Sequence, residues 1–311
     1  MPIIRANNLV KRFGSILAVD NLSLSINKGE IFGLVGPNCA GKSTTIKMLV
    51  GLLKPDRGEI LVNDVNISHN LNEVKKILGL VPQDVAIYEN ISASENVEFF
   101  GSLYGLHGKK LHEMAKEALE FTGLYDKRNE RPKRFSGGMK RRLNIACSIV
   151  HKPDILIMDE PTVGIDAQSR SHILESVKGI NKSGTTVIYT SHYMEEVENI
   201  CTRIGIVDFG RIIALGDKNE LKMLLNSEEI ITLEVDNACE CRFDEMSYLN
   251  GVTSMVIHEN LIQVVSYNAH DILQEIIEII LKNNKKIVNI SLKSPSLENV
   301  FLSLTGRNLR D

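Results

Sequence analysis

The sequence predicts an α/β fold, and three segments in the first two thirds of the chain carry that prediction. Ile31–Val35 is a short apolar run of the kind that buried parallel strands show, and Ile155–Asp159 begins with a second such run. Residues 44–53 place apolar side chains at helical spacing soon after the first run. Buried strands that alternate with amphipathic helices form a mainly parallel sheet covered by helices.

The turn between the first strand and the helix carries a phosphate-binding pattern. Nine consecutive residues fit G-x-x-x-x-G-K-[ST] without a gap, namely Gly36, Pro37, Asn38, Cys39, Ala40, Gly41, Lys42, Ser43 and Thr44. In such a turn the backbone N–H groups converge on the phosphates, the helix dipole favours the anion and Lys42 adds a positive charge. Ser43 is the expected hydroxyl ligand of Mg²⁺. These residues therefore predict a site for a nucleoside triphosphate.

The second apolar run ends in two adjacent carboxylates, Asp159 and Glu160. Asp159 is expected to reach Mg²⁺ through water, and Glu160 is expected to polarise the attacking water as a general base. A strand that merely ends in solvated acids is the alternative interpretation of this pair. The pair gains weight from a second glycine-rich turn, Ser136-Gly137-Gly138, which precedes a probable helix and predicts a second anion site.

The order of these motifs resembles the ATP-binding-cassette family. In chain order the set contains the phosphate loop, Gln83, the turn Ser136-Gly137-Gly138, the pair Asp159-Glu160, the turn Gly164-Ile165-Asp166 and His192. The resemblance implies a P-loop NTPase cassette in which the signature turn of one subunit closes over the triphosphate held by the loop of another. Hydrolysis then needs a head-to-tail pair of cassettes, and a monomer is expected to be nearly inactive.

The resemblance also implies roles for residues that are unremarkable alone. Gln83 is expected to reach Mg²⁺ and to act as a hinge for a helical subdomain, His192 to hold the γ-phosphate and Asp166 to reach across the dimer. Phe13 stands where the family stacks an aromatic ring on adenine, although a core aromatic of a first antiparallel strand is the alternative. The implied catalytic residues are Lys42, Glu160 and His192, and the implied metal ligands are Ser43, Gln83 and Asp159.

Two residues depart from the family pattern. Met139 replaces the glutamine that commonly closes the signature, and we expect this change to alter helix packing more than phosphate contact. Cys39 replaces a glycine that is common in the cassette phosphate loop. Because glycine tolerates backbone conformations that other residues resist, Cys39 is expected to be strained and to slow turnover.

The segments around these motifs predict two smaller subdomains of a cassette that spans residues 1–221. Apolar and polar residues alternate over residues 22–26, and residues 58–67 predict a strand pair, which together indicate an antiparallel β-subdomain. Residues 84–150 are the inserted helical subdomain that carries the signature. Three of its aromatic residues either pack against its own helices or face a partner: Phe99, Phe100 and Tyr104.

The remaining residues, 222–311, are expected to form a small C-terminal α+β domain. Residues 230–235, 261–265 and 287–292 predict strands, and residues 271–281 predict a helix. Ser294 and Pro295 are expected to cap and open a last helix, since proline is favoured in a first turn.

The tail from Pro295 to Arg307 resembles the ending of bacterial cassette subunits from drug, antibiotic and sodium efflux systems. That resemblance favours an exporter over an importer. A regulatory or stabilising role of this domain and a role linked to the transported substrate both stay open.

Composition narrows the partners of the chain. With 311 residues, 43% of them hydrophobic, and a net charge of −3, the chain is large enough to bury a core and lacks the basicity of a nucleic-acid-binding protein. No apolar stretch approaches the length that spans a bilayer, and no signal-peptide pattern is expected at the N-terminus. Cys239 and Cys241 form a close pair without a second pair to complete a metal site, so reduced thiols are expected.

The sequence therefore predicts the ATPase subunit of an ABC exporter, which uses ATP and Mg²⁺ and drives separate transmembrane permease subunits. It is expected to pair with a second ATP-binding cassette and to lie in the cytoplasm, peripheral on the inner face of the cell membrane. Two alternatives remain. One is a non-transport cassette ATPase that acts on ribosomes or DNA, and the other is a regulatory ATP-binding module without hydrolysis.

Overall fold

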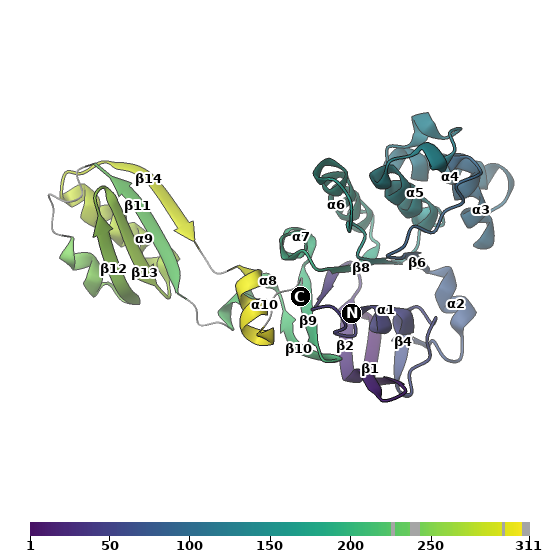
Figure 1. Cartoon of the computed structure of the whole chain (residues 1–311), viewed down its shortest axis with the longest axis horizontal. Helices are drawn as coiled ribbons and strands as arrows, with labels where there is room; N and C mark the ends of the chain where they lie inside the picture. Colours follow the sequence, from purple (N-terminus) through teal and green to yellow (C-terminus); the bar gives the residue numbers. More distant parts are fainter. Residues whose placement is uncertain (225–227, 237–242, 294–295, 307–311) are drawn as a thin grey trace. The chain divides into compact units, whose positions relative to one another are not determined.

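The computed structural model describes residues 1–224, 228–236, 243–293 and 296–306 (Figure 1). The chain divides into two compact units. The first contains Met1–Lys218 together with the residues from Leu304 onward, and the second contains Asn219–Ser303. The predictions for Cys239, Cys241, Ser294 and Pro295 lie outside the described residues.

A six-stranded sheet forms the centre of the first unit, and all of its neighbouring strands are parallel except the edge pair β10–β9. Its strands, in spatial order, are β10 (Arg211–Gly216), β9 (Arg203–Asp208), β3 (Ile31–Val35), β8 (Thr186–Ser191), β7 (Ile155–Asp159) and β6 (Leu78–Val81). Every residue of β3, β7 and β8 is buried, as expected for parallel strands that are covered on both faces. The predicted α/β fold is therefore confirmed.

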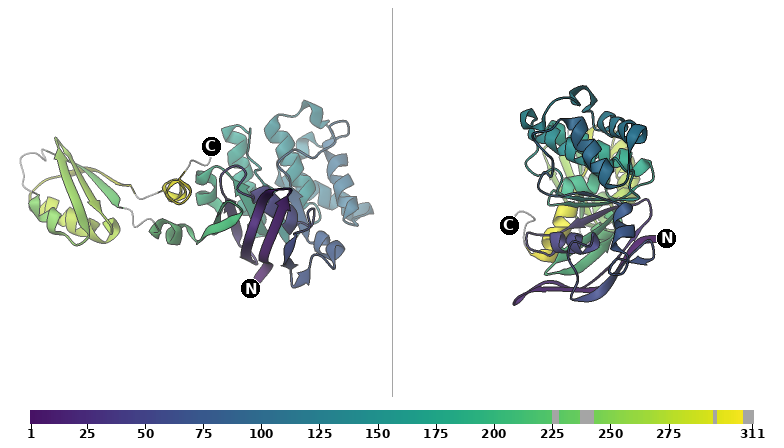
Figure 2. Two further views of the ribbon diagram at one scale, coloured as in Figure 1. Left: turned by 60° about the horizontal axis from the view of Figure 1, so that its bottom comes forward. Right: turned by 90° about the vertical axis from the view of Figure 1, so that its right-hand side faces the viewer.

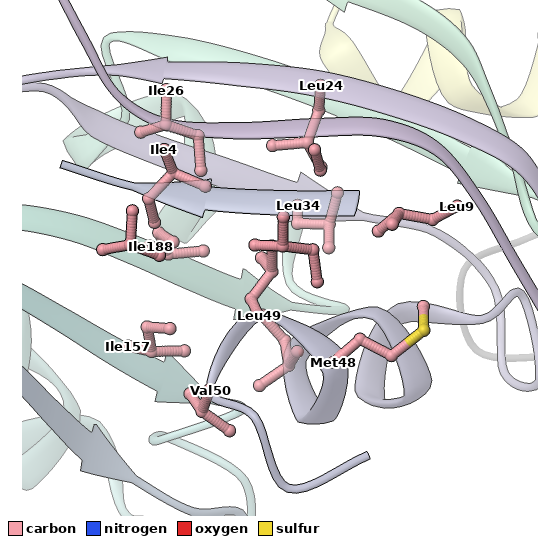
Figure 3. Close-up of a cluster of buried hydrophobic side chains, with 14 of the residues drawn as sticks. Ile4, Leu9, Leu24, Ile26, Leu34, Met48, Leu49, Val50, Ile157 and Ile188 are labelled. Carbon is pink, nitrogen blue, oxygen red and sulfur yellow. The ribbon is translucent and has the colours of Figure 1, made fainter. Parts of the chain in front are cut away.

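A second, antiparallel sheet has the order β2 (Ile16–Asn27), β1 (Pro2–Phe13), β4 (Arg57–Val62) and β5 (Val65–Asn66). The predicted alternation over residues 22–26 is seen as buried and exposed positions in turn. The buried side chains of this sheet meet those of the parallel sheet and of α1 (Lys42–Leu49) in one apolar cluster. Figure 3 shows Ile4, Ile26, Leu34 and Leu49 within that cluster.

The helices of the first unit lie around the parallel sheet. Their remaining bounds are α2 (Leu71–Lys76), α3 (Ala93–Leu103), α4 (Gly108–Phe121), α5 (Gly137–Ile149), α6 (Ala167–Lys182) and α7 (Met194–Ile200), with short 3₁₀ turns at Tyr125–Lys127 and Pro132–Arg134. In Figure 1, α1 and the antiparallel sheet lie on one side of the parallel sheet and α6 and α7 on the other. The phosphate loop therefore enters a helix that is held between two sheets.

The helix after the phosphate loop begins earlier and ends earlier than predicted. It spans Lys42–Leu49 rather than residues 44–53. Gly51 adopts a φ of 71°, a left-handed conformation in which glycine commonly ends helices. Leu53, which the helical pattern included, still packs against the core from the turn that follows. The apolar spacing thus continued past the end of the helix.

The helical insertion has its own apolar core, built from α3, α4 and α5. Ser92 caps α3 by accepting the N–H of Glu95, whose carboxylate accepts the N–H of Ser92 in return. Met139 packs against this core, so the departure from glutamine adds apolar packing at the start of α5. The three aromatic residues divide: Phe100 packs against the core, Tyr104 stacks on His151, and Phe99 is exposed.

The second unit is a four-stranded antiparallel sheet with one long helix. The sheet order is β12 (Val252–His258), β13 (Leu261–Ser266), β11 (Glu229–Val235) and β14 (Ile287–Lys293), and the helices are α8 (Lys218–Met223), α9 (Ala269–Lys282) and α10 (Leu297–Thr305), with a 3₁₀ turn at Asp244–Tyr248. Helix α9 lies along one face of the sheet (Figure 2), and its buried isoleucines belong to the apolar core of this unit. The predicted boundary at Leu221 falls within α8.

Two features of the second unit differ from the sequence-based expectation. Strand β12 was not predicted, because only Met255 and Ile257 of its central residues pack on the core and its alternation is weak. A cap of α10 at Ser296, whose hydroxyl accepts the N–H of Asn299, was not predicted.

We expect the buried His151 to make the stability of the fold depend on pH. Its Nε2 lies 3.2 Å from the carbonyl oxygen of Leu78, its ring stacks on Tyr104 with centroids 3.5 Å apart, and burial lowers the pKa of His151 to about 4. In the unfolded chain His151 is protonated below about pH 6.5, whereas in the folded chain it is protonated only below about pH 4. Because the unfolded chain binds this proton first, the free energy of unfolding decreases as pH falls from about 6.5 to 4. We compare the free energy of unfolding at pH 7 and at pH 4.5, measured by urea unfolding with circular dichroism. This free energy should decrease by about 1–3 kcal/mol less in His151→Gln than in the parent. An equal loss in both proteins would contradict a titrating His151.

Candidate active site

The phosphate loop is a tight turn closed by its own lysine. Lys42 Nζ donates to the carbonyl oxygens of Gly36 at 2.7 Å and Pro37 at 3.0 Å, and its side chain is buried. Burial lowers the pKa of Lys42, and the nearby charges of Glu160 and Asp159 oppose that shift. The lysine is thus held as a fixed cation at the mouth of the loop.

Two glycines let the loop approach its neighbours. A Cβ at Gly36 would lie 2.3 Å from the carbonyl oxygen of Val207, and a Cβ at Gly41 would lie 2.5 Å from that of Ala18. Gly41 also has a φ of 104°, which side chains rarely tolerate. The N–H of Gly210 in the β9–β10 hairpin donates to the carbonyl oxygen of Ala40 at 2.9 Å. The loop is therefore braced by β2 and by that hairpin.

Cys39 lies at the outer edge of the loop. Its φ is 63° and its side chain is exposed, whereas Cys147 and Cys201 are buried. A left-handed φ strains any residue with a Cβ. The departure from glycine at this position therefore has a conformational cost, as the sequence predicted.

The carboxylate pair is fixed by Thr190 at the end of the neighbouring strand. The Thr190 hydroxyl donates to Asp159 Oδ1 at 2.7 Å and accepts the N–H of Glu160 at 2.9 Å. Glu160 has a φ of 46°, and both carboxylates are buried. These contacts exclude a strand that merely ends in solvated acids. Backbone strain of this kind is stored where the surrounding structure over-determines it, and functional sites are common examples.

Three residues from separate segments converge on the Glu160 carboxylate. Gln83 Nε2 donates to Oε2 at 3.3 Å, and His192 Nδ1 lies 3.5 Å from the same oxygen. Lys42 Nζ lies 4.0 Å from Oε1. The carboxyl ends of β6, β7 and β8 and the turn after β3 meet here, which is where ligands bind in open parallel sheets. The structure thus brings together four residues that the sequence placed in one site.

The signature turn and Asp166 form a second group. Ser136 is exposed and accepts the N–H of Met139 at 3.2 Å, so it caps α5. A Cβ at Gly138 would lie 2.1 Å from Ser169 Oγ, which sets the turn against the start of α6. Asp166 caps α6 by accepting the N–H of Ser169 at 2.9 Å, and this bond lowers the pKa of Asp166.

Phe13 ends strand β1 and is 50% exposed. This exposure contradicts the alternative of a core aromatic. Lys11 Nζ lies 5.8 Å from its ring centroid, so one face of the ring is near a cation. The ring is available to a ligand or partner from solvent.

Two residues of this region were missed by the sequence-based reasoning. Arg141 is buried and its guanidinium donates to the carbonyl oxygens of Pro82 and Gln83, which ties helix α5 to the Gln83 segment. Burial lowers the pKa of Arg141. The residue stood in a basic run that resembled an ordinary solvated helix face. Thr190 gave no signal beyond a polar residue at the end of a strand.

The residues present fit a magnesium nucleotide. The first-turn N–H groups of α1 have no intrahelical acceptors, and Lys42 adds a fixed positive charge, which suits phosphate oxygens. Ser43 and Asp159 offer hydroxyl and carboxylate oxygens and Gln83 an amide oxygen, the hard ligands that Mg²⁺ prefers. The fold and this site define a phosphate-loop nucleotide hydrolase.

The chain belongs to the ABC transporter family. The family model described as ABC transporter matches residues 19–163. The chain is 44% identical to the linearmycin resistance ATP-binding protein of Bacillus subtilis (strain 168), over 99% of this chain and 100% of that protein. It is 35% identical to the daunorubicin/doxorubicin resistance ATP-binding protein of Streptomyces peucetius, over 99% of this chain and 94% of that protein.

A solved structure extends this comparison to the fold. A dimeric ATP-binding cassette in a post-hydrolysis state, bound to ADP and phosphate, matches with a TM-score of 0.63 at 26% identity, covering 69% of this chain and 98% of that one. The chain is thus the ATP-binding subunit of an exporter-type ABC transporter and an ATP hydrolase. Within the described residues, no helix is long and apolar enough to cross a membrane.

Cys39 should be the most nucleotide-protected of the three described cysteines. N-ethylmaleimide should modify it readily because it is exposed, and the bulky adduct should block nucleotide binding beside the phosphate loop. Preincubation with Mg-ATP should slow the modification, which mass spectrometry can follow at each cysteine. Cys39→Gly should remove the sensitivity and raise turnover, because glycine tolerates the φ of 63°. Labelling at one rate with and without ATP would show that this thiol points away from the nucleotide.

Proposed function

We propose that this subunit hydrolyses ATP at a head-to-tail cassette dimer and thereby drives export through separate membrane subunits. The observation that supports this most directly is the convergence of Lys42, Gln83 and His192 on the buried Glu160 carboxylate. Such an arrangement positions a base among groups that carry positive charge or donate hydrogen bonds. Phosphoryl transfer depends mainly on positioning and charge stabilisation.

In the proposed mechanism Glu160 is the general base. It accepts a proton from the attacking water while the water oxygen bonds to the γ-phosphorus and ADP departs. Lys42 and the loop amides hold the β- and γ-phosphates, and His192 contacts the γ-phosphate. Phe13 stacks on adenine. Ser43, Gln83 and Asp159 would hold Mg²⁺, which would neutralise phosphate charge at this site.

The signature turn and Asp166 complete the site of the partner cassette in trans. The exposed Ser136, with Gly137 and Gly138, begins a helix whose N-terminal N–H groups favour an anion. The exposed Asp166 lies next to this turn, with its Oδ2 3.5 Å from the position of a Gly138 Cβ. The dimeric cassette with ADP and phosphate supports a second cassette, identical or related, as the partner of this face.

A groove of about 620 Å³ between the parallel-sheet core and the helical insertion is the proposed contact for a permease subunit. Leu52 and Leu103 on its rim are 65% and 66% exposed, and the lining is largely apolar. Exposed apolar side chains gathered around a groove commonly mark a protein partner. This groove adjoins β6, the strand that leads to Gln83, so a partner docked there is connected to the site. The proposal places the subunit in the cytoplasm on the inner face of the membrane.

The drug-resistance relatives support an antibiotic-like cargo, and the match over nearly the full length of both relatives supports a transport role for the second unit as well. We propose residues 1–221 as the catalytic cassette and residues 222–311 as the accessory domain. A ribosome- or DNA-directed cassette is disfavoured by the acidic net charge of −3. A non-hydrolysing regulatory module is disfavoured by the arrangement of Glu160 and His192.

Glu160→Gln should retain nucleotide affinity and lower turnover by about 10²–10⁴-fold, because it removes the general base. Mg-ATP should then trap the variant as a dimer in size-exclusion chromatography. Glu73→Gln, an exposed change on α2, is the matched control and should behave as the parent. Phosphate release equal to the parent's would remove Glu160 from the role of base.

Leu103→Asp should weaken co-purification with the membrane subunits while leaving ATP binding unchanged, because it places a charge on the rim of the groove. Leu281→Asp, which alters an exposed leucine of α9 in the second unit, is the control. If Leu103→Asp co-purifies as well as the parent, the groove is not the permease contact.

A further inference from the structure

A buried carboxylate that the proposed mechanism does not use lies behind the His192 turn. Glu196 of α7 is only 3% exposed, yet three hydroxyl groups donate to its Oε2: Thr162 at 2.8 Å, Tyr189 at 2.8 Å and Ser191 at 3.0 Å. Arg170 Nε lies 3.4 Å from its Oε1. A buried charge is tolerated when it is paired and hydrogen-bonded, and Glu196 is both.

The donors come from the segments that carry site residues. Thr162 lies two residues after Glu160, and Arg170 lies one helical turn after Asp166, whose carbonyl oxygen accepts the Arg170 N–H at 2.9 Å. Ser191 directly precedes His192. One carboxylate therefore joins the base segment, the turn of Asp166 and the turn of His192.

The His192 turn is held from both of its ends. The Ser191 hydroxyl donates to Glu196 and also accepts the N–H of Tyr193 at 2.9 Å, so one hydroxyl spans His192. The Arg170 guanidinium carbon lies 4.4 Å from the centroid of the Tyr193 ring, and the rings of Tyr193 and His192 are 4.3 Å apart. Glu196, Ser191, Tyr193 and Arg170 thus form a closed set of contacts, and Tyr193 in turn contacts the His192 ring.

We propose that Glu196 is a positioning residue, which fixes His192 and the Asp166 turn relative to each other so that both meet the nucleotide in one arrangement. This inference rests on the proposed role of His192 at the γ-phosphate. Glu196 does not touch the reacting atoms. Its contribution is geometric, and displacements of about 1 Å in an active site can cost about 10²-fold in rate.

Three single substitutions separate this role from a merely structural one. Ser191→Ala removes the hydroxyl that spans His192. Glu196→Gln keeps an oxygen for the hydroxyl donors but turns an amide N–H₂ toward Arg170, which breaks that ion pair. Tyr189→Phe removes a hydrogen bond of 2.8 Å to the same oxygen from strand β8, two residues before Ser191, and serves as the matched control.

The deciding measurement is the affinity of the full chain for Mg-ATP and for Mg-ADP by calorimetry. Ser191→Ala and Glu196→Gln should weaken Mg-ATP binding about fivefold or more and leave Mg-ADP binding unchanged, because ADP has no γ-phosphate for His192 to contact. Tyr189→Phe should lower the thermal midpoint without changing either affinity. Equal losses for ATP and ADP, or the same pattern in Tyr189→Phe, would overturn the positioning role.

Turnover gives the second readout and keeps this inference distinct from the proposed function. Ser191→Ala and Glu196→Gln should lower kcat about 10–100-fold, whereas Tyr189→Phe should keep it within about twofold. A parent chain that releases no phosphate would refute the proposed hydrolytic function, while the ATP-to-ADP affinity comparison would still decide the role of Glu196.

Discussion

The site depends on the burial of Glu160 at the carboxyl end of β7. A buried carboxylate is costly unless it is paired and hydrogen-bonded, and here Lys42, Gln83 and His192 supply the partners from three other segments. Those segments all leave one edge of the parallel sheet, so the sheet order β3-β8-β7-β6 decides which side chains can meet. The hydrolytic site is in this sense a consequence of strand order.

Local apolar pattern explains which parts of the fold the sequence could predict. Strands β3 and β7 are fully buried over five residues each, β3 is apolar throughout and β7 is apolar up to Asp159, and such runs are readable without knowledge of their neighbours. Strand β12 was missed because none of its residues is fully buried and its partly buried residues, Val252, Met255 and Ile257, do not alternate regularly. The predicted length of α1 was wrong because the helix ends before Gly51, while Leu53 continues the apolar spacing from the turn that follows.

The site residues likewise divide into those that the sequence predicted and those that it did not. Residues with a motif of their own, such as Lys42 and Glu160, were predicted from local pattern, and Gln83 and His192 were predicted only from the order of the whole set. Arg141, Thr190 and Glu196 were not predicted, because each acts through a contact with a segment distant in the sequence. Nothing in their neighbouring residues distinguishes them from an ordinary basic, polar or acidic position.

The residues that act through distant contacts connect Glu160 to two surfaces at which a partner is proposed to bind. Arg141 ties the signature helix α5 to the backbone of Gln83, and Gln83 reaches Glu160, so a shift of the helical insertion changes the surroundings of the base. Glu196 ties the His192 turn to the start of α6 on the other side of the same site. The first connection reaches Glu160 through Gln83, which follows β6, and the second through His192, which follows β8; these two strands lie on either side of β7. In the proposed mechanism, a movement at the groove and a movement at the Asp166 turn would therefore reach the base by separate routes, one through Gln83 and the other through His192.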